Sequence, residues 1–130
     1  MKRIAAAAAL LTLVSVPASA QFMRAQGTFS SVSSELTTIL LDKEKGVIAA
    51  SAEVVQGACS GSISGIGAIK GKTLRLEPYT KLPGSEKCAL EITFSQDWKK
   101  ARLVEAESCS AYHGAGCGWE GQEVKRKLNQ

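Results

Sequence analysis

The chain has 130 residues, with 16 Lys and Arg, 12 Asp and Glu, one His and four Cys, a size that fits one domain. This composition argues against a zinc-finger array, a haem protein and a coiled coil. No apolar run reaches the roughly 18 to 20 residues that a membrane-spanning helix needs, and no glycine-rich phosphate loop is present.

The first twenty residues have the features of a secretory signal. Lys2 and Arg3 give a positive start, residues 4–14 form an apolar run, and Pro17 precedes a small-residue site that ends at Ala20. This order predicts a Sec-type signal peptide over residues 1–20, cleaved after Ala20; an N-terminal anchor helix that is never cut is the alternative. We therefore expect a periplasmic or secreted protein. The first cysteine is far from the cleavage point, which argues against a lipoprotein.

The excess of basic over acidic residues comes mainly from the two ends of the chain. Loss of Lys2 and Arg3 leaves 14 basic and 12 acidic residues in residues 21–130, and three of those basic residues are at 125–127. A nucleic-acid partner needs a concentrated basic face with stacking aromatic residues. The sequence has no such face, so we expect no nucleic-acid partner.

The exported part begins with a short segment that lacks a clear pattern. Residues 21–27 are expected to be a loose N-terminal arm, followed by a single β domain over residues 28–130. Residues 28–42 are predicted to form a strand that is buried on both faces near its end, because apolar residues occupy both parities there. A short helix over residues 31–41 is the alternative.

Short alternating runs continue through the rest of the chain. The most regular of them begins at Cys88, with Leu90, Ile92 and Phe94 alternating with more polar residues. The glycine-rich run that begins at Cys59 predicts either a bent strand or a strand that another backbone approaches closely. The expected elements are a charged turn over 42–46, strands over 47–55, 59–71, 73–79, 88–95, 101–107 and 118–127, and a loop over 81–87. Short strands with glycine and proline turns predict an all-β fold, a small antiparallel barrel or sandwich.

The four cysteines of an exported chain predict a framework of two disulfides. The preferred pairing is Cys59–Cys88 with Cys109–Cys117, because the second pair closes a short loop rich in glycine. Another option joins Cys59 to Cys109 and Cys88 to Cys117. A metal site formed by Cys109, His113 and Cys117 is the chemical alternative, but the surrounding glycines disfavour the helix that it needs. A fourth ligand is also missing, so no metal or other cofactor is expected.

The strongest local signal for recognition lies between Cys109 and residue 121. A disulfide there would hold a loop that carries Tyr112 and His113 and is followed by Trp119. Tyrosine and tryptophan are common anchors of binding interfaces, so these three residues are predicted to be exposed and to bind a partner. In the alternative, Tyr112 and Trp119 close the end of the barrel and His113 bonds a nearby carbonyl group.

The sequence contains little that indicates an enzyme. His113 is the single histidine, and no nucleophile motif such as Gly-x-Ser-x-Gly is present. Glu105 and Glu107 lie two apart on a predicted strand and so share a face, which is typical of a solvated sheet surface. We therefore predict that the protein is not an enzyme and has no catalytic residues.

The run Cys-Ser-Ala-Tyr-His-Gly-Ala-Gly-Cys-Gly-Trp-Glu-Gly at residues 109–121 resembles a C-terminal signature of small exported bacterial proteins of uncharacterised function. Their pattern is Cys-x-x-Tyr/Phe-His-Gly-x-x-Cys-x-Phe/Trp-x-Gly, and the preceding run from Cys88 to Phe94 is similar as well. The resemblance covers residues 59–121. It implies a β-rich periplasmic or secreted domain and assigns no catalytic residue.

The chain is also loosely similar to small periplasmic lysozyme inhibitors, which are exported, disulfide-bonded β-barrels. It lacks their tyrosine-containing Ser-Gly loop, for which Ser60-Gly61 and Ser64-Gly65 are the nearest pieces. An inhibitor of a basic lysozyme benefits from an acidic surface, and residues 21–130 are not acidic. This departure weakens the specific comparison with lysozyme inhibitors.

Together these features predict an exported, non-enzymatic binding protein, of the inhibitor or immunity type, that acts on a cell-wall or envelope enzyme. Its partner would be another envelope or secreted protein; no membrane span is expected, and the oligomeric state stays open. The alternatives are a structural envelope protein without a defined ligand and a small hydrolase that uses His113.

Overall fold

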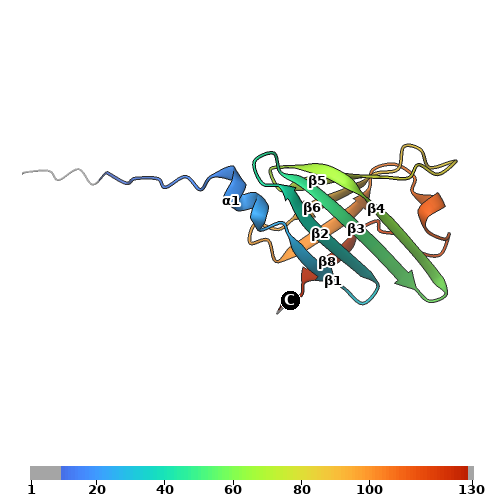
Figure 1. The fold of residues 1–130 in the computed structure, drawn as a ribbon. Coiled ribbons are helices and arrows are strands. Elements are labelled where there is room, and N and C mark those ends of the chain that lie inside the picture. Colours follow the sequence, from blue (N-terminus) through green and yellow to red (C-terminus); the bar gives the residue numbers. More distant parts are fainter. Residues whose placement is uncertain (1–9, 129–130) are drawn as a thin grey trace, which may run out of the picture.

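Eight antiparallel strands form a closed barrel in the computed structural model, which describes residues 10–128 (Figure 1). Each strand pairs with the next one in the chain, and the last pairs with the first to close the sheet. The strands are β1 (Gly27–Ser30), β2 (Ser34–Asp42), β3 (Val47–Gln56), β4 (Cys59–Lys70), β5 (Thr73–Pro78), β6 (Leu90–Phe94), β7 (Lys100–Glu105) and β8 (Gln122–Arg126). The predicted all-β fold is confirmed, and its form is a barrel.

Side chains fill the interior of the barrel. Because successive residues of a strand point to opposite faces, alternate positions of every strand enter the core. In β3 these are Ile48, Ala50, Ala52 and Val54, all of which are buried. An eight-stranded barrel is just wide enough for side chains to occupy its interior. The core includes completely buried Phe29, Leu36, Leu74, Leu90, Leu103, Trp119 and Val124.

The segment predicted as one strand over residues 28–42 is two strands, β1 and β2. A turn separates them, because the Ser31 hydroxyl accepts hydrogen bonds from the backbone N–H groups of Ser33 and Ser34, at 3.4 and 3.0 Å. The expected burial of both faces is also wrong. Ile39 and Leu41 of β2 point outward, and each is 54% exposed.

The predicted loose arm is in fact ordered against the barrel. Helix α1 (Ala18–Met23) precedes β1, Phe22 packs against the core, and Ala25 is completely buried. The guanidinium group of Arg126 donates to the backbone oxygens of Arg24, Gln26 and Trp98. This segment therefore closes one end of the barrel, with α1 lying beside it in Figure 1.

The predicted signal peptide falls partly on residues 1–9, which lie outside the described residues. Residues 10–17 form no helix or strand. Among residues 10–128 no helix combines the length and the apolar character that a bilayer crossing requires.

The two disulfides join Cys59 to Cys117 and Cys88 to Cys109. The preferred pairing of Cys59 with Cys88 and of Cys109 with Cys117 is therefore wrong, and so is the other option considered. Cys88 and Cys109 flank the open end of the β6–β7 hairpin, where the Ala106 N–H donates to the Ala89 carbonyl at 2.9 Å. Two disulfides fit an oxidising environment and an exported protein.

The position of the Cys59–Cys117 disulfide follows from the path of the long connection after β7. Residues 106–121, which include the short helix η1 (Ser110–Tyr112), cross from β7 to β4 before they return to β8. His113 forms a β-bridge with Gly61, which brings Cys117 beside Cys59. The close approach of another backbone to the glycine-rich strand is confirmed, since a Cβ atom at Gly61 would lie 2.5 Å from the Tyr112 carbonyl oxygen.

Candidate binding site at the loop end of the barrel

The end of the barrel opposite α1, called the loop end below, is built from the connections at residues 31–33, 57–58, 79–89 and 106–121. Both disulfides lie there, and so do all three residues predicted to bind a partner. We call the last of these connections, residues 106–121, the cap segment. It carries the three predicted site residues, most of which turn inward.

Trp119 is completely buried and belongs to the core. The prediction that it is exposed is therefore wrong. Its large indole packs into the core at the loop end of the barrel. The ring of His113 meets the Trp119 ring edge-on, at 5.4 Å between centroids and 81° between planes.

His113 is held on both sides of its ring. Its Nδ1 lies 2.6 Å from the Gly114 carbonyl oxygen, and its Nε2 lies 3.0 Å from Oε1 of Glu105. The side chain is only 10% exposed. Both ring nitrogens thus face oxygen atoms of the chain itself, an arrangement that anchors the cap segment.

Glu105, the last residue of β7, organises the cap segment around its carboxylate. Besides lying close to His113, Oε1 accepts a hydrogen bond from the backbone N–H of Trp119 at 3.1 Å. Oε2 accepts one from the backbone N–H of Cys109 at 3.4 Å. The side chain is 16% exposed, so these bonds are shielded from water and stronger than they would be at the surface. Sequence reasoning placed Glu105 on a solvated face and missed this role.

Tyr112 is partly buried and connects the cap segment to the neighbouring loop. Its hydroxyl donates to the Thr80 carbonyl at 2.5 Å and accepts the Leu82 N–H at 3.0 Å. A further bond runs from the Ala111 N–H to the Ser85 hydroxyl at 3.1 Å. These bonds hold the loop over residues 79–87, which we call the tyrosine loop, in one conformation.

Tyr79 begins the tyrosine loop and projects from the loop end. Its side chain is 87% exposed, whereas its N–H donates to the Ser64 carbonyl of β4 at 2.9 Å. The ring therefore stands on a fixed backbone and leaves its surface free. A shallow groove beside it is lined by Ser62, Ile63, Ser64, Pro78, Tyr79, Thr80, Leu82 and Tyr112. Sequence reasoning missed Tyr79, whose only signal was an aromatic residue at the end of a predicted strand.

A charged turn completes the tyrosine loop. The Gly84 N–H donates to the Glu86 carboxylate at 3.1 Å. Hydrogen bonds from the backbone N–H groups of Glu86 and Gly84 lower the pKa of this carboxyl below its usual range. The turn is thus stabilised by the ionised form of Glu86.

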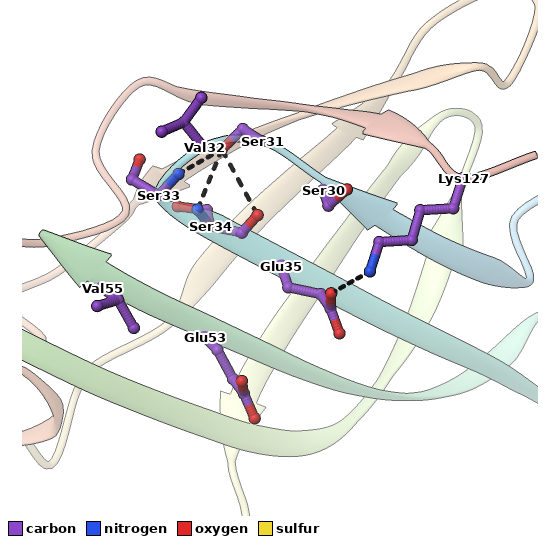
Figure 2. Close-up of a pocket in the computed structure, with 9 residues that line it drawn as sticks. All are labelled: Ser30, Ser31, Val32, Ser33, Ser34, Glu35, Glu53, Val55 and Lys127. Atoms are coloured by element: carbon purple, nitrogen blue, oxygen red, sulfur yellow. Dashed lines mark hydrogen bonds and ion pairs between the residues drawn. The ribbon is translucent and has the colours of Figure 1, made fainter.

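A second hollow at the loop end lies between the β1–β2 turn and the end of β3 (Figure 2). Its polar groups bond mainly to one another: Lys127 pairs with Glu35 at 2.5 Å, and Ser31 bonds the turn that follows it. Val32 at the tip is exposed and Val55 of β3 is half exposed. Two lining groups are exceptions among residues 10–128, since the carboxylate of Glu53 forms no ion pair and the buried hydroxyl of Ser34 has no hydrogen-bond partner.

The alternative metal site is not formed. Cys109 and Cys117 belong to different disulfides, so neither has a thiolate to offer a metal. Among residues 10–128, no group of three or more metal-ligating side chains gathers elsewhere.

Comparison with known proteins gives no relative: no family model, no curated protein and no solved structure matches the chain. The resemblance to small exported proteins and to lysozyme inhibitors therefore stays a prediction.

Proposed function

We propose that the protein is exported to the periplasm or the medium and binds another envelope or secreted protein there, as an inhibitor of a cell-wall or envelope enzyme. The supporting observation is Tyr79, which is 87% exposed on a loop that Tyr112 and the adjacent disulfide hold in place. Rigid aromatic residues gain contact area on binding at little entropic cost.

A projecting, preorganised loop is suited to a concave partner surface, such as the substrate cleft of an enzyme. The tyrosine loop offers Tyr79 as an apolar anchor with a hydroxyl group at its tip. Lys81 and Glu77 beside it form an ion pair at 3.7 Å, so the loop presents no strong net charge. Shape and the aromatic anchor, more than electrostatic steering, would then provide the affinity.

The roles of Tyr112, His113 and Trp119 change in this proposal. Tyr112 acts as a positioning residue for the tyrosine loop, and His113 and Trp119 support the cap segment behind it. The hydrolase alternative gains no support from His113, whose two ring nitrogens already face Gly114 and Glu105.

The test is an inhibition and binding experiment with the exported protein. The full-length chain is expressed so that the host processes it, and the purified product is assayed against cell-wall-degrading enzymes and used to capture partners from an envelope extract. We expect Tyr79→Ala to abolish inhibition or capture of the partner. The matched control is Val32→Ala, because Val32 is also fully exposed on a turn of the loop end.

Two results would contradict the proposal. One is a partner that Tyr79→Ala and wild type bind equally well. The other is the absence of any saturable partner, which would favour a structural envelope protein.

A further inference from the structure

The two disulfides differ in how far they are shielded from solvent. Cys88 and Cys109, which form the inner disulfide, are 1% and 0% exposed and belong to the core. Cys59 and Cys117, which form the outer disulfide, are each only partly buried. A disulfide is cleaved where a thiolate can reach one of its sulfur atoms. The outer disulfide is therefore the one that a reductant can approach in the folded protein.

Small residues surround the outer disulfide. Cys117 lies between two glycines in the chain, and Cys59 lies between an alanine and a serine. A Cβ atom at Gly114 would lie 2.8 Å from the Cys59 sulfur, so backbone and not a side chain covers that side of the bond. Cys117 also lines a shallow hollow beside the cap segment. We therefore expect a thiolate to attack from the hollow, at the sulfur of Cys117.

The outer disulfide fastens the glycine segment, which we define as residues 114–118, to β4. The β-bridge of His113 with Gly61 holds one end of this segment, and the completely buried Trp119 holds the other. Between these ends, the Cys117 N–H bonds a carbonyl group of the same segment, at 3.5 Å. Loss of the outer disulfide would thus loosen the glycine segment while both of its ends stay in place.

The rest of the loop end has its own supports. The inner disulfide joins the residue after the tyrosine loop to the cap segment. The Tyr112 hydroxyl bonds the backbone of Thr80 and Leu82. The barrel and the tyrosine loop are therefore expected to keep their structure when the outer disulfide is reduced.

We propose that the outer disulfide is a site of thiol–disulfide exchange, cleaved and re-formed in the folded protein by a partner that carries a pair of thiols. One thiolate of the partner attacks Sγ of Cys117. A bond forms between these two sulfurs, the outer disulfide breaks, and Cys59 leaves as a thiolate that takes up a proton. The second thiolate of the partner then attacks the partner's own sulfur in this mixed disulfide and releases Cys117, which is protonated in turn. Two electrons and the two thiol protons pass to Cys59 and Cys117, and the partner ends as a disulfide.

The charge of the hollow restricts the kind of reductant. The carboxylates of Glu105 and Glu120 line it together with Gln56 and Gln122, and no lysine or arginine among residues 10–128 does. These carboxylates repel an anionic thiol such as glutathione. A neutral dithiol or a protein with paired thiols fits the hollow better.

The test is reduction of the purified, exported protein without denaturant. One probe is dithiothreitol, a neutral dithiol. The other is a Cys-x-x-Cys oxidoreductase whose second cysteine is replaced by serine, so that the mixed disulfide is trapped. Free thiols are alkylated and located by mass spectrometry. We expect Cys59 and Cys117 to be released at least about tenfold faster than Cys88 and Cys109, and the oxidoreductase to be trapped on Cys117.

Further measurements follow the consequences of reduction. Amide exchange in the glycine segment should accelerate, whereas that of Leu82 should not change. Cystamine, a small disulfide, should then re-form the outer disulfide without unfolding of the barrel. Glu120→Gln should speed reduction by glutathione more than reduction by dithiothreitol. The matched control, Cys59→Ser combined with Cys117→Ser, retains the inner disulfide and should release no thiol under the same conditions.

Three results would overturn the proposal. They are equal rates of reduction for the two disulfides of the wild type, trapping of the oxidoreductase on Cys88 or Cys109, and loss of near-ultraviolet circular dichroism when the outer disulfide alone is reduced. None of these measurements involves Tyr79, so the proposed binding function and the exchange site can fail independently.

Discussion

The hydroxyl of Tyr112 lies 3.0 Å from the backbone nitrogen of Leu82 and thereby joins two loops that are 30 residues apart in the chain. The same hydroxyl donates to the Thr80 carbonyl. A residue that sequence analysis selected as a contact for a partner thus fixes the loop from which Tyr79 projects.

Tyr112→Phe should loosen the tyrosine loop without disturbing the barrel. The change removes both hydrogen bonds of the hydroxyl and keeps the ring, so the free energy of unfolding should fall by about 1 to 2 kcal/mol. Amide exchange of Leu82 should accelerate more than that of core strands, as NMR can measure. Tyr79→Phe, which alters an exposed hydroxyl, should affect neither quantity; equal effects of the two variants would contradict the assigned role.

Glu105→Ala should destabilise the protein much more than Glu107→Ala. The first change leaves the backbone N–H groups of Trp119 and Cys109 without their acceptor and removes the carboxylate that lies 3.0 Å from His113 Nε2. Charge-assisted, shielded bonds of this kind are costly to break, and we expect a loss of about 3 kcal/mol in urea unfolding. Glu107 is exposed, and its removal should change stability by less than about 0.5 kcal/mol.

Peptide mapping without reduction should recover Cys59 joined to Cys117 and Cys88 joined to Cys109. Double replacement by serine should lower stability by about 4 kcal/mol for the first pair and about 3 kcal/mol for the second, because the closed loops differ in length. The sequence separations are 58 and 21 residues. Recovery of a peptide that joins Cys109 to Cys117 would refute the described path of the cap segment.

The contribution of Glu86 should depend on pH. Backbone N–H groups lower the pKa of this carboxyl when the protein folds, from an ordinary value of 4.5. Its stabilising effect is therefore fully present above about 4.5 and is lost as the pH falls through the lower folded pKa. Wild type should be more stable than Glu86→Gln at pH 7, and the difference should shrink as the pH falls through the lowered pKa of Glu86. A constant difference across this range in thermal unfolding would contradict the assignment.

The sequence was sufficient for the all-β fold and for most of its strands, and insufficient for the ends of the barrel. Alternation along residues 88–95 predicted a strand whose apolar residues share one face, because period-two burial is a local pattern. The disulfide pairing was wrong because it depends on where the cap segment crosses the barrel, and that path is set by the distant contacts of His113 with Gly61 and Glu105. The wrong prediction that Trp119 is exposed has the same origin, and so does the failure to select Tyr79, since an aromatic residue in a loop has no periodic neighbour that fixes its direction.

The wrong prediction that both faces of β2 are buried had a different cause. Ile39 and Leu41 were predicted to be buried because apolar residues occupied both parities of the strand. In the barrel they are half exposed. Only the arrangement of β2 beside β3 and β4 reveals that these residues belong to one surface.

The contacts of Arg126 also determine how the molecule is oriented when either terminus is attached to something else. Its guanidinium group binds the backbone of Arg24 and Gln26, so the segment before β1 and the end of β8 lie together at the end of the barrel opposite Tyr79. A reporter or surface anchor fused after β8 would leave the tyrosine loop pointing outward. A circularly permuted chain, in which a short linker joins residue 128 to residue 21 and new ends open in the exposed turn of residues 43–45, should still form the same barrel.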